Sequence, residues 1–185
     1  MTFTIVPYGE RHGKKGCGKE GFDCGNPALN LYLARYAGQD VRRHYAALFA
    51  AVRNDTDRII GYYALSNASV RLRDVHEGLR RRLPKYPEIP AIRLGRLAVD
   101  KSVQRQGIGA ELLGDAILRS LTNVAAWSVM AVDAKDEKAR SFYLRFGFDS
   151  IEGDNMRLYA MRQDLEAYLP AGVAFSLSQK PHIII

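Results

Sequence analysis

Short apolar runs separated by polar turns account for most of the 185-residue chain, a pattern typical of a sheet with connecting helices. Residues 45–52 and 59–69 are rich in aromatic and aliphatic side chains. The polar stretch 54–57 between them predicts an antiparallel hairpin. Residues 91–99 and 127–132 show little alternation, which predicts two strands buried on both faces. Three shorter runs predict strands at residues 3–6, 148–152 and 156–161.

Apolar residues at helical spacing predict the helices. Four of them, at positions 29, 32, 33 and 36, follow an Asn-Pro pair suited to a helix start. Further helices are predicted at 74–83, 107–121 and 137–146, the last one closed by Gly147. The order is mixed α/β with β-α-β pieces in the second half. We expect one domain at residues 1–170 and a tail at 171–185, which fits an extra strand, an oligomer contact or a disordered end.

The chain is basic, with 27 Lys and Arg against 20 Asp and Glu and a net charge of +7. Much of the excess is clustered at residues 42–44 and at Arg71, Arg73, Arg80, Arg81, Arg82 and Lys85. Clustered cations favour a polyanionic partner such as nucleic acid, although a basic excess can also serve solubility alone.

Other features of the sequence indicate a cytoplasmic protein with no membrane partner. No apolar run approaches the ~20 residues of a membrane helix, and the first residues do not resemble a signal peptide. The two cysteines, Cys17 and Cys24, lack further ligands at zinc-site spacing, so we expect free thiols and no metal.

The strongest local motif is the glycine-containing stretch QRQGIGA at residues 104–110, between a predicted strand and a predicted helix. Glycines allow a tight turn, and the N–H groups at the start of the following helix suit a pyrophosphate. The stretch lacks the Lys of a P-loop and the third Gly of a dinucleotide loop. Taken alone, it could also be a glycine-rich turn without a ligand.

Two neighbouring segments give this motif a context. RLAVD at residues 96–100 precedes it, and ARSFYLRFGF at residues 139–148 follows it. Together the three segments resemble the GNAT acyltransferase superfamily over about residues 20–163. The resemblance implies an α/β GNAT fold, in which a mixed, mostly antiparallel sheet is flanked by helices and splays into a V-shaped gap for CoA.

The resemblance also implies acetyl-CoA as cofactor and assigns the residues that bind it. The backbone of Leu97, Ala98 and Val99 would contact the pantetheine arm and the acetyl carbonyl. The pyrophosphate would be bound by Gln104, Arg105, Gln106, Gly107, Ile108, Gly109 and Ala110.

Three more stretches resemble the GNAT toxins of toxin–antitoxin pairs. They are FDCGNPAL at residues 22–29, GYYALS at 61–66 and VDAKD at 132–136. This resemblance implies acetylation of the α-amino group on charged tRNA, a ribbon-helix-helix antitoxin, a homodimer and a basic groove for tRNA. The chain departs from these toxins in the cysteine-containing loop 9–21 and in the tail after Pro170.

Tyr143 matches the general acid of the family. A phenol with a pKa of about 10 stays protonated and can donate a proton to the leaving thiolate. Tyr143 could instead be a packing aromatic beside Phe142, but adjacent helical residues point about 100° apart, so one can pack while the other faces the cleft. We interpret Asp133 and Asp136 as cap or turn residues. A base is dispensable because an α-amine has a pKa near 8.

Arg93 and Arg96 lie on the predicted strand before the loop, where they either pair with carboxylates or contact tRNA phosphates. Arg42, Arg43, Arg80 and Arg81 would extend the same surface. Two other functions stay open. One is acetylation of a small amine or of a peptide amine, and the other is a non-catalytic module that binds CoA or nucleic acid.

Overall fold

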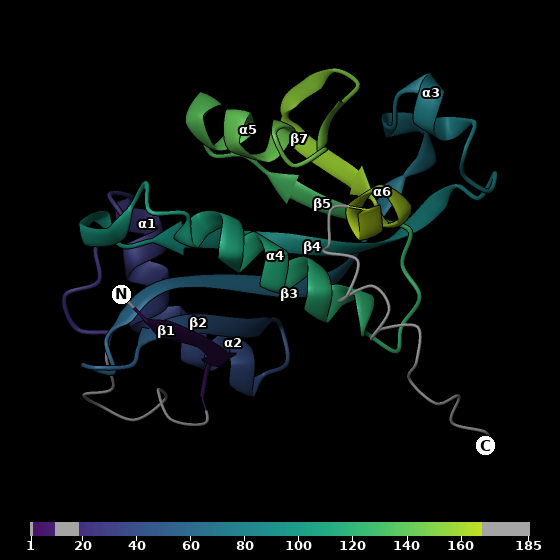
Figure 1. The fold of residues 1–185 in the computed structure, drawn as a ribbon. Helices are drawn as coiled ribbons and strands as arrows, with labels where there is room; N and C mark the ends of the chain where they lie inside the picture. The colour runs from purple at the N-terminus through teal and green to yellow at the C-terminus, as the bar shows by residue number, and fades with distance from the viewer. Residues whose placement is uncertain (1, 10–18, 168–185) are drawn as a thin grey trace. The chain divides into compact units, whose positions relative to one another are not determined.

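The computed structural model describes residues 2–9 and 19–167, and the chain divides into two compact units. The first unit comprises the residues up to Ser66 together with Leu94–Ala116. The second comprises Asn67–Arg93 and the residues from Ile117 onward. The seven strands follow the order β1-β2-β3-β4-β5-β7-β6, and β3 (Ile59–Arg71) and β4 (Glu88–Val99) each supply a segment to both units (Figure 1).

In the first unit, β1 (Phe3–Pro7) pairs antiparallel with β2 (Ala47–Arg53), which pairs antiparallel with β3. The predicted hairpin is therefore confirmed, with Ala50 opposite Tyr62. The short η3 helix (Lys101–Val103) follows β4, and Asp100 caps it by accepting from the N–H of Ser102.

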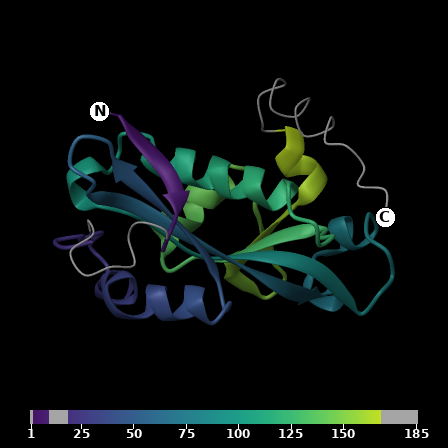
Figure 2. The ribbon, with the colours of Figure 1, turned by 90° about the horizontal axis from the view of Figure 1, so that it is seen from below.

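Helices cover both faces of these strands. α1 (Pro27–Leu31), a π-helical turn η1 (Tyr32–Tyr36) and α2 (Ala37–Arg42) run on as one helical segment, and Asn26 caps its start. This segment and α4 (Ile108–Leu121) lie on opposite sides of the strands (Figure 2). Alternation along β3 explains the arrangement, because Tyr62 points to the α1 side while its neighbours face α4.

Gly61 allows α4 to approach the sheet closely. A Cβ at this position would lie 2.8 Å from Cδ1 of Leu112 and 3.1 Å from the carbonyl oxygen of Ala98. Because real Cβ atoms almost never come as close as 2.8 Å, a side chain here would force Leu112 to shift and would crowd the Ala98 carbonyl. The close packing of Leu112 on β3 therefore depends on this glycine.

The second unit contains β5 (Val129–Asp133), β6 (Asp149–Ile151) and β7 (Asp154–Met161), with β7 antiparallel to both others. Its helices are η2 (Leu72–Asp74), α3 (Glu77–Arg80), α5 (Glu137–Leu144) and α6 (Arg162–Ala167). The core of this unit packs buried residues of the β3–β4 connection, such as Val75 and Leu79, against Val129, Tyr159 and Met161.

Two predictions about secondary structure are wrong. The helix expected at 74–83 is reduced to four residues, because the chain enters it at His76, a β-region cap, and Pro84 follows soon after. The strand at 91–99 is not buried on both faces, since Arg93 and Gly95 are exposed while Ile92 and Leu94 are buried. The predicted tail lies outside the described residues. No helix in the described part of the chain is long and apolar enough to cross a membrane.

Candidate active site

The loop between η3 and α4 is shaped like an anion-binding turn. Arg105 and Gly107 both have left-handed backbone conformations, with φ of +64° and +86°. Left-handed residues in a turn can direct neighbouring N–H groups toward one side, an arrangement with which backbones bind anions. Residues 105–107 are exposed, so a ligand can reach this part of the loop.

The hydrogen bonds of the loop show which N–H groups a ligand could use. Within residues 2–9 and 19–167, no acceptor is recorded for the N–H groups of Gln106, Gly107, Ile108 or Gly109. They stand at the N-terminus of the 14-residue helix α4, where the helix dipole favours negative charge. This arrangement fits a pyrophosphate.

One of the predicted N–H donors of the loop already makes a hydrogen bond within the protein. The N–H of Ala110 donates to the carbonyl oxygen of Gly107 at 2.9 Å, as part of the first turn of α4. To serve a pyrophosphate, the N–H of Ala110 would have to leave or share this bond, and its role in binding stays a prediction.

The side chain of Gln104 faces the protein and anchors the loop at its start. Its Nε2 donates to the carbonyl oxygen of Val99 at 2.9 Å and to that of Cys24 at 3.0 Å. Gln104 therefore ties the end of β4 to the segment that precedes α1.

A charged network holds the same junction. The N–H of Asp23 donates to Oδ2 of Asp100 at 3.0 Å, and Lys101 returns bonds to Asp23 from its N–H at 2.8 Å and from its Nζ at 2.9 Å. The Asp100 side chain is only 3% exposed and also pairs with Arg58 at 3.2 Å. We call Asp23, Asp100, Lys101 and Gln104 the loop brace.

The pKa values of the brace carboxyls show that both are held as anions. Hydrogen bonds from Lys101, Gly25 and Asn30 lower the pKa of Asp23 to about 2. Burial of Asp100 would raise its pKa, but bonds from Ser102 and from the N–H of Asp23 outweigh burial and lower it. The brace is therefore intact at neutral pH.

Tyr143 lies in the second unit, on α5, which is preceded by Asp136. As predicted, Asp136 is a cap, and its carboxylate accepts from the N–H of Ala139 at 2.7 Å. Tyr143 is the buried residue of this helix, and its ring contacts those of Phe142 and Phe148 at centroid distances of 5.1 and 5.5 Å. Burial raises the pKa of Tyr143, so the hydroxyl stays protonated well beyond neutral pH.

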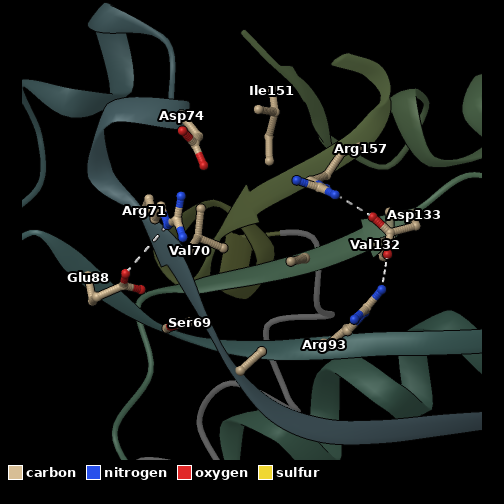
Figure 3. A pocket seen from close by; sticks show the side chains of 12 residues that line it. Ser69, Val70, Arg71, Asp74, Glu88, Arg93, Val132, Asp133, Ile151 and Arg157 are labelled. Carbon is tan, nitrogen blue, oxygen red and sulfur yellow. Dashed lines mark hydrogen bonds and ion pairs between the residues drawn. The ribbon is translucent and has the colours of Figure 1, made fainter. Parts of the chain in front are cut away.

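Arg93 belongs to a pocket of about 480 Å³ in the second unit, shown in Figure 3. It pairs with Asp133, which also pairs with Arg157 of β7 at 3.3 Å. Asp133 is therefore an ion-pair partner on the pocket wall, and its interpretation as a cap or turn residue is wrong. Two guanidinium groups therefore share the Asp133 carboxylate, and the pocket lining as a whole contains three arginines and three carboxylates.

The other predicted tRNA-binding arginines are divided between the two units. In the first unit, the Arg96 guanidinium carbon lies 3.6 Å from the ring centroid of Tyr32, a cation–π contact, while Arg42 and Arg43 are exposed. In the second unit, Arg80 donates to the carbonyl oxygens of Val75 and Arg73, and Arg81 pairs with Glu77 one helical turn away.

Sequence reasoning did not identify the Asp23–Asp100 contact or the role of Arg157. The first joins residues 77 positions apart, and no local pattern points to it. Arg157 could have been suggested by the sequence, because it directly precedes the apolar end of a strand, at a position that is exposed to solvent.

Comparison with known proteins defines the class of this chain. Residues 37–162 match the model of the acetyltransferase (GNAT) domain, and the chain belongs to this family. It is an acetyl-CoA-dependent N-acetyltransferase, and the predicted α/β GNAT fold is confirmed.

Three individual proteins to which this chain is similar give more detail than the family alone. A tRNA-acetylating toxin of Mycobacterium tuberculosis is 33% identical over 150 residues, which cover 80% of this chain and 88% of the toxin. KacT, known from the crystal structure of a tyrosine-to-phenylalanine mutant, has 30% sequence identity to this chain and a TM-score of 0.82. The match covers 91% of this chain and 100% of the KacT chain. AtaT complexed with acetyl-methionyl-tRNAfMet is 28% identical with a TM-score of 0.79, covering 90% of this chain and 98% of AtaT.

Proposed function

We propose that this protein is the toxin of a toxin–antitoxin pair and that it transfers acetyl from acetyl-CoA to the α-amino group of aminoacyl-tRNA. We assign the substrate from the 33% sequence identity to a tRNA-acetylating toxin across 80% of the chain. An acetylated α-amine can no longer form a peptide bond, so translation stops. By the same relationship, we expect a ribbon-helix-helix antitoxin and a homodimer.

The chain's own residues suit binding of the acetyl donor. The N–H groups of Gln106–Gly109, which have no acceptor within residues 2–9 and 19–167, bind the pyrophosphate at the start of α4, and the exposed Arg105 adds positive charge. The backbone of Leu97–Val99 contacts the pantetheine arm. Acetyl-CoA, when bound, supplies the thioester whose acetyl group is transferred.

Tyr143 acts as the general acid. The neutral α-amine forms the new C–N bond as the C–S bond breaks, and the phenol donates its proton to the departing sulfur. The amine releases its own proton to solvent, and Tyr143 is then reprotonated. Because burial raises the pKa of Tyr143, the phenol keeps its proton throughout the working pH range.

The basic side chains Arg42, Arg43, Arg80, Arg81, Arg93 and Arg96 contact tRNA phosphates in this proposal. These arginines differ in whether a carboxylate already pairs with them. Arg93 shares Asp133 with Arg157, whereas Arg42 and Arg43 have no carboxylate partner in the described part of the chain. We therefore expect substitution of Arg42 and Arg43 to weaken tRNA binding more than substitution of Arg81, which already pairs with Glu77.

Cell-free translation tests the proposal. The wild-type protein should stop translation only when acetyl-CoA is present, and Tyr143→Phe should inhibit far less. Inhibition without acetyl-CoA would indicate a binding module and contradict the enzymatic mechanism. Failure to inhibit, together with rapid acetylation of a small amine or a peptide, would contradict the tRNA substrate and leave the acetyltransferase class intact.

A further inference from the structure

A second pocket in the second unit, of about 520 Å³, lies in the connection between β3 and β4. Its polar lining consists of four cationic side chains, one carboxylate and one tyrosine: Arg71, Arg73, Arg80, Lys85, Glu88 and Tyr86. We call it the Tyr86 pocket. It is distinct from the pocket of Figure 3, although Arg71 and Glu88 border both.

The local sequence explains why this hollow is fixed. The N–H of Leu72 donates to the carbonyl oxygen of Pro87 at 3.0 Å, so the two ends of the connection lie side by side. Between them, α3 rises from the strands, as Figure 1 shows. Pro84 and Pro87 restrict the returning segment, and the N–H of Tyr86 donates to the carbonyl oxygen of Pro84 at 2.9 Å.

One cation of the pocket is held in place by the backbone. Arg80 donates from Nη2 to the carbonyl oxygen of Val75 at 2.9 Å and to that of Arg73 at 3.2 Å, and from Nε to Val75 at 3.3 Å. Its nearest carboxylate, on Glu152, lies at 3.5 Å. A guanidinium fixed in this way loses little entropy when it binds an anion.

The remaining cations are weakly paired and accessible. Arg71 lies 3.9 Å from Glu88 and Arg73 lies 3.6 Å from Asp74, and their side chains are 59% and 74% exposed. Lys85 has no carboxylate partner within the described residues. Exposed ion pairs at these distances are weak, so the groups can turn to an incoming phosphate.

An exposed aromatic ring completes the site. Tyr86 is 70% exposed, and within residues 2–9 and 19–167 it shares such exposure only with Tyr36 and Tyr45, while the other tyrosines there are buried. A basic hollow with an accessible aromatic ring is the arrangement with which proteins bind single-stranded nucleic acid. The base stacks on the ring and the phosphates meet the cations. An acidic protein segment would use the cations but would gain little from the ring.

We propose that the Tyr86 pocket binds an unpaired nucleotide of the tRNA, with its base on Tyr86 and its flanking phosphates on Arg71, Arg73 and Lys85. The identity of the RNA rests on the proposed function. The stacking site itself rests on the pocket alone.

The test measures binding of uncharged tRNA by fluorescence anisotropy over a range of salt concentrations. Tyr86→Ala should weaken binding by roughly 5- to 150-fold, which corresponds to the loss of one stacked base, while Tyr86→Phe should bind as wild type does. The double variant Arg73→Gln/Lys85→Gln should lower the slope of log K against log salt by about 1.4 to 1.8. A control that removes two charges from the first unit, Arg53→Gln/Lys19→Gln, should leave the slope unchanged.

Equal binding by Tyr86→Ala and wild type would overturn the proposal, and so would a pocket double variant that behaves like the control. Binding of polyglutamate provides a further check. If polyglutamate binding depends on Arg73 and Lys85 while tRNA binding does not, the pocket serves an acidic protein segment and the proposal is wrong. Unchanged thermal unfolding of each variant confirms that the fold is intact.

Failure of the proposed function is distinguishable from failure of this inference. If wild type acetylates charged tRNA and Tyr86→Ala has the wild-type affinity and KM for it, only the pocket assignment falls. If wild type acetylates no charged tRNA but Tyr86→Ala still loses RNA binding that Tyr86→Phe retains, the pocket assignment stands and the proposed function falls.

Discussion

Replacement of Gln104 by Ala tests whether the loop brace controls affinity for acetyl-CoA. The substitution removes two hydrogen bonds, to the carbonyl oxygens of Val99 and Cys24 at 2.9 and 3.0 Å, without touching the N–H groups that face the ligand. A neutral hydrogen bond contributes a net ~0.5 to 1.5 kcal/mol, so the variant loses about 1 to 3 kcal/mol of loop ordering.

At 1.4 kcal/mol per factor of ten, this loss corresponds to a dissociation constant for acetyl-CoA roughly 5- to 140-fold higher. Once the site is saturated the same residues carry out the reaction, so kcat should stay close to the wild-type value while KM for acetyl-CoA rises. Titration calorimetry with acetyl-CoA and steady-state kinetics measure the two effects separately.

Gln106 provides a matched control in the same loop. Its side chain is exposed and makes no hydrogen bond within residues 2–9 and 19–167, so Gln106→Ala should bind acetyl-CoA as wild type does. Unchanged affinity in Gln104→Ala, or an equal loss in both variants, would refute the reasoning that the brace shapes the loop.

Three further predictions follow from the same structure. Gly61→Ala should lower the free energy of unfolding by about 1 to 3 kcal/mol because its Cβ would meet Leu112 and the Ala98 carbonyl, whereas Gly114→Ala, with nothing within 4 Å, should be neutral or stabilising in thermal unfolding. Asp23 has a folded pKa of about 2 against an ordinary 3.8, so its stabilising effect is present above about pH 4 and lost as pH falls toward 2. Asp23→Asn should therefore flatten the decrease in melting temperature between pH 5 and pH 2.5, and an unchanged decrease would contradict this assignment. Because burial raises the pKa of Tyr143, the initial rate on a hydrolysis-resistant, amide-linked aminoacyl-tRNA should show no decline near pH 10. A decline at that pH would show that the phenol ionises normally.

Local sequence patterns predicted much of the fold and part of the site. The Asn-Pro pair at 26–27 and Asp136 start helices as expected, and the hairpin of β2 and β3 forms across residues 54–57. The tight turn at residues 104–110 could also be predicted, because Gly107 adopts a backbone conformation that glycine favours.

The parts that were missed depend on contacts between residues distant in sequence. The bond between Asp23 and Asp100, and the sharing of Asp133 by Arg93 and Arg157, arise only when separate strands and loops are assembled. For Gln104 only the backbone N–H was assigned a role, and the bonds of its side chain to Val99 and Cys24 were not foreseen. A single sequence carries no signal for such partners, whereas caps and turns are determined within a few residues.

Orientation within a helix was the other difficulty. Spacing could not tell whether Tyr143 or Phe142 packs against the core, and the structure buries Tyr143 more deeply than Phe142. Its role as the acid therefore stays a prediction, which the substitution of its hydroxyl tests.

The most direct test of the central claim is the mass of the tRNA terminus after reaction. Total charged tRNA is incubated with acetyl-CoA and the protein, then digested with a ribonuclease that releases the terminal aminoacyl-adenosine for mass spectrometry. We predict that one or more aminoacyl-adenosines gain the mass of one acetyl group on the α-amine, and that Tyr143→Phe largely abolishes this gain. Aminoacyl-adenosines of unchanged mass, in a preparation that acetylates another amine, would contradict the account.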